Sequence, residues 1–162
     1  PAASLKERSI EVSASSIQSK EYADLIEQMI ATMYDDDGIG LAAPQIGKNI
    51  RLFVIGKEAM KKKEMEVSQG TLVPDQDTAL FNVTWEKTRK KKLAQVEGCL
   101  SVPKVYGTVE RYSDILVTGL DQHGERVVFH AKKYLARVIQ HETDHTDGVL
   151  FIDRATNIRS VA

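Results

Sequence analysis

The sequence predicts an α+β fold, in which mostly antiparallel strands pack around a late central helix and one further helix lies near the N-terminus. Two observations support this prediction. Helical apolar patterns occur early and late in the chain, and several short apolar runs separated by turns lie between them. With 162 residues, 42% of them hydrophobic and 28% charged, the chain is long enough for one buried core. We therefore expect a single domain over residues 1–162.

The first helix is predicted from apolar residues at steps of three and four. Ser19 is a suitable N-cap, and Gly38 lies beyond the expected end. A short buried strand is expected next, at residues 51–55. The helical pattern itself consists of Tyr22, Leu25, Ile26, Met29, Ile30 and Met33.

Residues 56–78 have few apolar anchors, which predicts a loop or hairpin insertion. Lysines occupy positions 61–63, and a second basic run covers residues 89–92. Neither run is interleaved with aromatic residues, so we interpret both as solvated surface.

The remaining elements are strands that lead to the late helix. Residues 121–124 form the expected turn of a hairpin, and Gly148 supplies a stop after the helix predicted at 132–147. The strands are expected at residues 79–85, 93–96, 105–109, 115–120 and 126–130.

Charge and hydropathy exclude several functional classes. Lys and Arg number 22 and Asp and Glu 23, so the net charge of −1 predicts no direct nucleic-acid binding and no acidic membrane partner. No apolar run approaches the roughly 20 residues of a membrane helix. The first twenty residues do not have the layout of a secretory signal, and the single cysteine fits a reducing compartment.

The late helix contains the motif HExxH. His141 and His145 are four residues apart and therefore lie on one helix face, with Glu142 beside them. This spacing lets two imidazoles bind one metal ion while the glutamate acts as a general base. Val138 and Tyr134 share the histidine face, which indicates that it points toward a core or a pocket.

A catalytic metal site of this kind needs a third protein ligand. The candidates are Cys99, another histidine (His123 or His130) or a downstream acid, and the residues alone leave the choice open. Cys99 follows a predicted strand and stands beside a glycine that favours a tight turn.

The segment GIGLAAPQ at residues 38–45 contains small residues that allow a close approach of the backbone. It does not have the GxGxxG spacing of a dinucleotide loop. Gln45 is a neutral amide that can donate a hydrogen bond into a site.

Together, GIGLAAPQ at 38–45, EGCLS at 97–101 and QHETDH at 140–145 resemble, in this order, the motifs of the peptide deformylase family. The resemblance implies a metal-dependent hydrolase that removes the N-formyl group from formylmethionine of nascent polypeptides and releases formate. It implies Cys99, His141 and His145 as ligands of one divalent metal, Fe2+ natively, with Zn2+, Ni2+ or Co2+ as substitutes.

The resemblance also implies the other roles. Glu142 is the general base, and the Gln45 amide and the Leu100 backbone N–H stabilise the oxyanion. Ile39, Gly40, Tyr134 and Val138 are expected to bind the substrate. Glu97 and Arg111 are expected to form an ion pair behind the cysteine turn.

Two alternatives remain at this stage. One is another HExxH metallopeptidase, which would take its third ligand from a histidine or glutamate well after His145. The residues that follow His145 contain neither, and Asp147 and Asp153 are the only acids among them. The other is an inactive, metal-binding deformylase-like protein. The deformylase interpretation implies formylmethionyl nascent peptides and the ribosome surface as partners. It places the protein in the bacterial cytoplasm, with a phage origin or a processed organellar form as alternatives.

Overall fold

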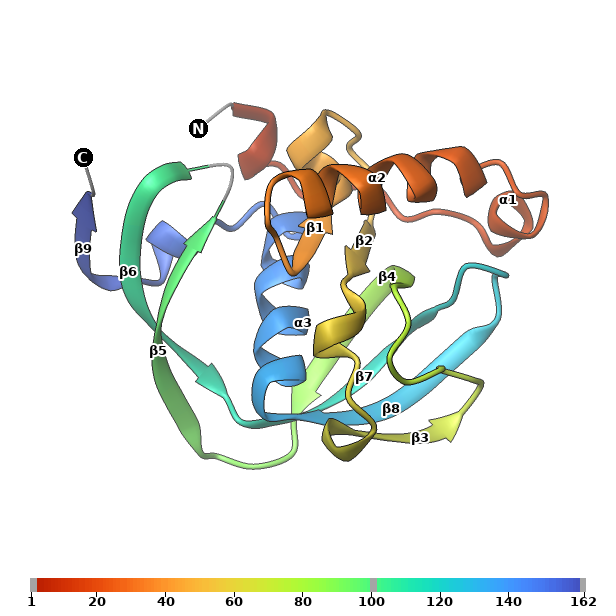
Figure 1. The fold of residues 1–162 in the computed structure, drawn as a ribbon. Coiled ribbons are helices and arrows are strands. Elements are labelled where there is room, and N and C mark those ends of the chain that lie inside the picture. The colour runs from red at the N-terminus through yellow and green to blue at the C-terminus, as the bar shows by residue number, and fades with distance from the viewer. Residues whose placement is uncertain (1–2, 100–101, 161–162) are drawn as a thin grey trace.

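The computed structural model describes residues 3–99 and 102–160 and has the expected α+β architecture. Helix α3 (Lys133–Thr146) runs through the middle of the molecule, and helix α2 (Ala23–Asp35) crosses one end (Figure 1). The short helix α1 (Ala14–Gln18) precedes α2. The prediction of a late central helix and one main N-terminal helix is confirmed. In the described ranges, no helix is both long and apolar enough to cross a membrane.

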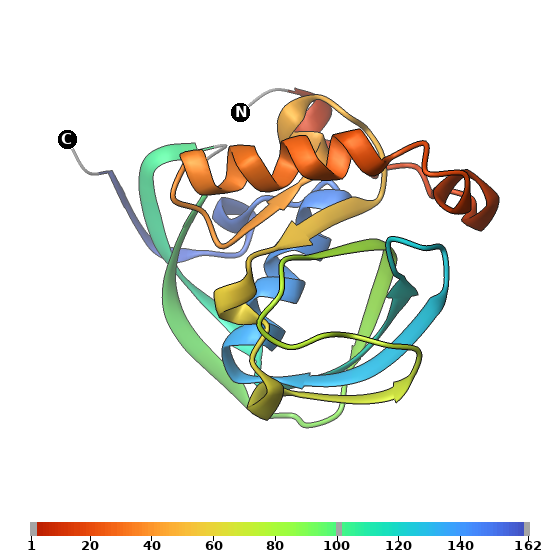
Figure 2. The ribbon, with the colours of Figure 1, turned by 45° about the vertical axis from the view of Figure 1, so that its right-hand side comes forward.

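The strands form two sheets on either side of α3, and every pairing within the sheets is antiparallel (Figures 1 and 2). The larger sheet has the order β1-β2-β4-β7-β8-β3, with β1 (Gly40–Ala42), β2 (Leu52–Ile55), β3 (Met65–Gln69), β4 (Thr78–Lys87), β7 (Asp114–Leu120) and β8 (Arg126–Lys132). The smaller sheet has the order β5-β6-β9, with β5 (Lys92–Cys99), β6 (Val102–Tyr112) and β9 (Thr156–Ser160). Short 3-10 helices cover Ala3–Lys6, Ala43–Ile46, Lys57–Ala59, Lys62–Glu64 and Phe151–Asp153.

Strand β2 is buried on both faces. Leu52 and Val54 belong to the hydrophobic cluster that includes α2, whereas Phe53 and Ile55 belong to the cluster that includes α3. A strand covered on both faces needs apolar side chains at every position, which explains the continuous apolar run in this part of the sequence.

Strand β7 shows the alternation of a strand with one buried face. Its burial alternates along all seven residues, and it pairs with β8 from Asp114–Lys132 to Leu120–Arg126. In the connecting turn, Asp121 Oδ1 accepts hydrogen bonds from the backbone N–H groups of His123 at 2.8 Å and Glu125 at 3.0 Å. The hairpin that the turn sequence predicts is therefore present.

The insertion at residues 56–78 is more ordered than its composition suggests. It contains β3, which pairs with β8 and extends the edge of the larger sheet. Its far end is anchored by Asp77, which accepts hydrogen bonds from the Tyr34 hydroxyl and, at 2.9 Å, from the backbone N–H of Lys57. Strand β9 was not predicted, because its five residues are all exposed and carry no hydrophobic alternation.

Candidate active site

The two histidines of the HExxH motif lie next to each other on α3. The ring centroids of His141 and His145 are 5.0 Å apart, and the rings meet edge to face. The side chain of His141 is 14% exposed and lines a pocket, whereas His145 is buried beneath it. Burial lowers the pKa of His145 to about 3, so this ring is neutral and can act as a metal ligand at physiological pH.

Glu97, on β5, fixes the orientation of His141. The distance from His141 Nδ1 to Glu97 Oε1 is 2.8 Å. An ionised carboxylate only accepts hydrogen bonds, so Nδ1 carries the proton and Nε2 keeps the lone pair. Metal-binding histidines are commonly held by such a carboxylate.

Two buried arginines keep Glu97 ionised. Arg111 of β6 donates from Nε to Oε2 at 2.9 Å and from an Nη atom to Oε1 at 2.8 Å. Arg137 of α3 donates a further hydrogen bond to Oε2. Burial alone would raise the pKa of Glu97, but the hydrogen bonds from Arg111 and His141 outweigh it and hold the pKa well below its usual range.

The same network continues along α3 to the C-terminal part of the chain. Arg111 also donates to Asp144 Oδ2 at 2.6 Å, and Arg154 donates to the two carboxylate oxygens of Asp144 at 2.7 and 3.0 Å. The expected pair of Glu97 and Arg111 is therefore part of a larger network. Sequence reasoning missed Arg137, Asp144 and Arg154, although Arg137 precedes His141 by one helical turn and thus lies on its face.

Glu142 is held against the backbone of β1. It is 3% exposed, and a Cβ atom placed on Gly40 would lie only 2.6 Å from its Oε2. Within the described residues, Glu142 Oε1 is buried without a hydrogen-bond partner. Burial raises the pKa of Glu142 to about 7, although the charges of His141 and Arg111 act in the opposite direction.

Gln45 lies in the 3-10 helix that follows β1. The backbone N–H of Ala42 donates to Gln45 Oε1 at 2.9 Å, which fixes the orientation of the amide. With its oxygen used in this way, the Gln45 amide can present its N–H groups as donors.

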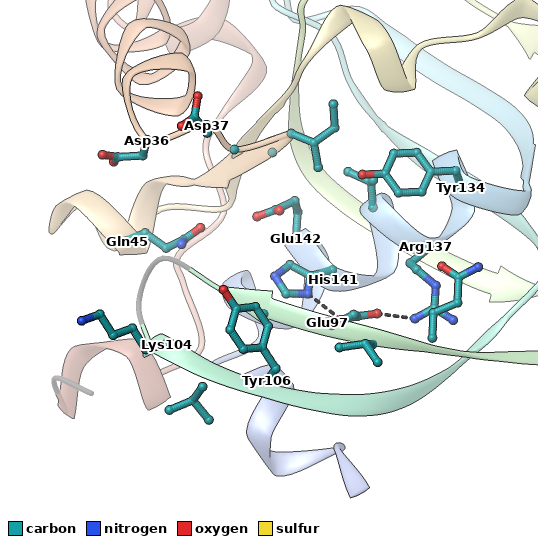
Figure 3. A pocket seen from close by; sticks show the side chains of 18 residues that line it. Asp36, Asp37, Gln45, Glu97, Lys104, Tyr106, Tyr134, Arg137, His141 and Glu142 are labelled. Carbon is teal, nitrogen blue, oxygen red and sulfur yellow. Dashed lines mark hydrogen bonds and ion pairs between the residues drawn. The ribbon is translucent and has the colours of Figure 1, made fainter. Parts of the chain in front are cut away.

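The proposed substrate-binding residues gather in one pocket of about 730 Å3. Figure 3 shows Gln45, His141 and Glu142 between the segment that follows α2 on one side and strands β5 and β6 on the other. The pocket lining contains Ile39, Gly40, Gln45, Glu97, Tyr134, Val138, His141 and Glu142 from the sequence-based set. It also contains Asp36, Asp37, Val96, Lys104 and Tyr106, which sequence reasoning did not identify.

The third metal ligand is not tested by the structure. Cys99 is the last residue of β5, but its side chain lies outside the described part, and Leu100 lies outside it entirely. Among the described residues, no group of three His, Cys, Asp or Glu side chains is close enough to hold a metal. The other candidate histidines lie elsewhere: His123 is in the β7–β8 turn, and His130 Nε2 is 2.9 Å from Thr88 Oγ1.

The donor set nevertheless fits a metal ion. Two adjacent imidazoles, one neutral through burial and one oriented by a carboxylate, suit a transition metal. Next to them lies Glu142, whose Oε1 has no hydrogen-bond partner among the described residues.

Comparisons with known proteins agree with this geometry. Residues 1–161 match the profile of the family described as Polypeptide deformylase. The chain is 41% identical over 139 residues to the peptide deformylase of Hydrogenovibrio crunogenus, covering 86% of this chain and 74% of the relative. The crystal structure of a Thermotoga maritima peptide deformylase has a TM-score of 0.78 and 35% identity, covering 94% of this chain and 91% of that one. A Synechococcus elongatus peptide deformylase in complex with actinonin has a TM-score of 0.78 and 39% identity, and the match covers 96% of this chain and 75% of that one.

Proposed function

This chain belongs to the peptide deformylase family, and we propose how the residues of its pocket divide the family's reaction among them. It is a metal-dependent hydrolase that removes the N-formyl group from the N-terminal formylmethionine of newly synthesised polypeptides and releases formate. The roles of individual residues are our own proposal. The observation that carries it is the buried Oε1 of Glu142, which has no hydrogen-bond partner in the described part of the chain and belongs to a pocket that His141 also lines.

The metal ligands that we propose are His141, His145 and Cys99. The orientation of His141 by Glu97 and the burial of neutral His145 support the first two. Two imidazoles and a thiolate suit iron, zinc, nickel and cobalt, and we propose Fe2+ as the native ion from the family resemblance. When bound, the metal supplies a Lewis acid and lowers the pKa of a water to near neutrality.

Glu142 is the proposed proton carrier. A carboxyl group whose pKa is about 7 can accept the proton of the attacking water and later release it near neutral pH. The water oxygen adds to the formyl carbon, the C–N bond breaks, and Glu142 delivers the proton to the departing amine nitrogen. The products are formate and a peptide with a free N-terminal amine.

Gln45 and the Leu100 backbone N–H are the proposed donors to the oxyanion that develops on the formyl oxygen. The Gln45 amide is oriented before the substrate arrives, because Ala42 holds its oxygen. Donors that need no reorganisation stabilise a developing charge most effectively.

The substrate is proposed to lie along the free edge of β1. Among the strands that the structure describes, β1 is the outermost of its sheet and pairs with β2 alone, so its other edge can pair with an extended peptide. Ile39, Tyr134 and Val138 line the same pocket and provide apolar surface for the methionine side chain.

The structure gives a reason to reject the zincin-type alternative. Asp147 pairs with Arg51 at 2.8 Å, and Asp153 accepts a hydrogen bond from the backbone N–H of Leu150 at 3.0 Å and lies 3.7 Å from Lys6 Nζ. Both acids after His145 are therefore engaged away from the histidine pair. The inactive alternative is disfavoured because Glu142 and Gln45 are both present at the pocket.

We further propose formylated nascent chains at the ribosome surface as the physiological substrate and the bacterial cytoplasm as the compartment. The test is formate release from a short formyl-methionyl peptide by anaerobically purified protein, with its metal content measured on the same sample. We expect formate release in proportion to bound metal, and inhibition by actinonin. Metal-loaded protein that releases no formate would contradict the assignment.

A further inference from the structure

A second cavity, of about 630 Å3, lies away from the active-site pocket, and its lining has more basic than acidic side chains. It is formed where the start of β3, the β4–β5 connection and the β8–α3 junction meet, at the end of the molecule opposite α2 (Figure 1). Its lining includes Lys63, Arg89, Lys91, Lys132 and Lys133, and we refer to these five residues as the basic groove.

The five cations of the basic groove are exposed, and none of them forms an ion pair with any residue that the structure describes. Three carboxylates also line the cavity, those of Glu64, Glu66 and Asp114, so the five cations leave a smaller excess of positive charge. Glu64 Oε1 accepts the backbone N–H of Leu135 at 3.1 Å, and Asp114 accepts the Ser113 hydroxyl at 2.6 Å. Positive charges that line a cavity without ion-pair partners raise the electrostatic potential there, and a positive potential attracts anions.

The basic character extends beyond the groove itself. Lys87 and Lys92 flank it along the chain and both lie over the ring of Tyr112, at 5.3 and 4.9 Å from its centroid. Ten of the chain's 22 Lys and Arg residues lie in these three segments: Lys61, Lys62, Lys63, Lys87, Arg89, Lys90, Lys91, Lys92, Lys132 and Lys133. The balanced net charge of −1 therefore conceals a strongly polarised distribution.

The shape and chemistry of the groove fit a polyanion better than a single phosphate. A lone phosphate would seek the N-terminal N–H groups of α3, but the N–H of Leu135 is already taken by Glu64. The cations come from three separate segments, so several phosphates along one backbone can contact them together.

The absence of apolar anchors distinguishes among polyanions. Among the described residues, the large exposed hydrophobic side chains lie outside the groove lining. A membrane-binding surface normally has such apolar anchors beside its lysines. A surface that recognises nucleobases normally has aromatic side chains on which the bases stack. We propose that the basic groove binds the phosphodiester backbone of RNA without sequence preference. If the proposed function is correct, this contact holds the enzyme near the RNA-rich site where formylated chains are made.

The proposal is tested by fluorescence anisotropy of metal-loaded protein with a labelled oligouridine of about 20 nucleotides. If about four phosphates are contacted, affinity should fall about 50-fold between about 50 and 200 mM salt. The triple variant Arg89→Gln/Lys91→Gln/Lys132→Gln should bind at least about tenfold more weakly, and its salt slope should be smaller by about 2.

The matched control is Arg8→Gln/Lys20→Gln/Lys48→Gln, which removes the same three charges from exposed positions outside the groove. It should bind RNA like the unmodified protein. Both triple variants should keep formate release, so a folding defect or a failure of the proposed function is distinguishable from lost RNA binding. If the groove triple variant folds poorly, Lys91→Gln and Lys132→Gln are measured singly, each with a slope change of about 0.7.

Three results would overturn the proposal. The first is no RNA binding at low salt, and the second is an equal loss of binding in the two triple variants. The third is groove-dependent binding to phosphatidylserine vesicles that is stronger than binding to RNA, which would identify an anionic bilayer as the partner.

Discussion

Gly40 and Glu142 are in such close contact that no side chain fits between them. A Cβ on Gly40 would stand 2.6 Å from Glu142 Oε2, 3.0 Å from Cδ and 3.1 Å from Cγ. The glycine at this position of β1 thus fixes how far the carboxylate extends from α3, and it joins two motifs that are about a hundred residues apart in the sequence.

Gly40→Ala should therefore impair catalysis rather than folding. The added methyl group displaces the Glu142 carboxylate, and a misplacement of about 1 Å at a reacting group costs about 100-fold in turnover. We expect that loss in kcat, with metal content and Tm close to those of the unmodified protein. The matched control is Gly56→Ala, whose Cβ would meet Ile39 O at 3.3 Å and leave Glu142 untouched. Equal effects of the two changes would show that the Gly40 contact has no special role.

Glu97→Gln should weaken metal binding and destabilise the fold together. The substitution leaves Arg111 and Arg137 buried without their carboxylate, and breaking a buried ion pair costs about 3–5 kcal/mol of unfolding free energy. It also removes the orientation of His141, which should lower metal affinity by about 10–100-fold. Chemical denaturation and metal titration measure the two effects. Glu110→Gln, at an exposed position of β6, should change neither.

The stabilisation by Glu97 should depend on pH in a defined direction. Its folded-state pKa lies below the unfolded value of about 4.3, so its contribution is full above that value and is lost as the pH falls toward the folded pKa. The difference in unfolding free energy between metal-free unmodified protein and metal-free Glu97→Gln should therefore shrink as the pH is lowered from 7 to below about 4. A difference that stays constant over this range would refute the assignment of the ion pair.

Gln45→Ala should reduce kcat by about 100- to 1,000-fold, because removal of one oxyanion donor raises the barrier by about 2.7–4 kcal/mol. The Michaelis constant should change little if the donor acts mainly in the transition state. Gln95→Ala provides a control, since Gln95 lines the same pocket and is exposed. Steady-state kinetics with a formyl-methionyl peptide measures the loss of kcat in each variant. A loss in Gln95→Ala as large as that in Gln45→Ala would contradict the role of Gln45 as an oxyanion donor.

An unformylated, denatured protein should remain uncut by the metal-loaded enzyme. A zincin-type site needs a histidine or glutamate after His145, and none follows in this sequence. The two acids that do follow, Asp147 and Asp153, are engaged with Arg51 and Leu150. Gel electrophoresis after prolonged incubation checks this. Internal cleavage that depends on Glu142 would revive the endopeptidase alternative.

Much of the fold could be predicted from periodicity. The early helix and the β7–β8 hairpin follow from apolar spacing and turn residues, because both elements bury one face against a core. Strands β3 and β9 could not be predicted in this way. Residues of β9 are all exposed, so its strand pairing leaves no hydrophobic alternation in the sequence. In β3 the half-buried Met65 and Val67 do alternate with polar residues, but the strand has only five residues and lies in a segment with few apolar anchors.

The site was only partly predictable for a related reason. The spacing of His141 and His145 is a local property of one helix, so the sequence alone places them together. Arg137, Asp144 and Arg154 act through partners on other elements, and the sequence does not show which charges the fold brings together. The same holds for the basic groove, whose cations come from three segments.

Glu142 is expected to transfer the proton in a reaction for which the metal ligands alone are insufficient. The Glu142→Ala variant tests this proton transfer, with bound metal and formate release measured on the same anaerobically purified sample. We predict unchanged metal content and a loss of formate release of about 100- to 10,000-fold, the usual contribution of a general acid–base. Full activity of the metal-loaded alanine variant would contradict the account.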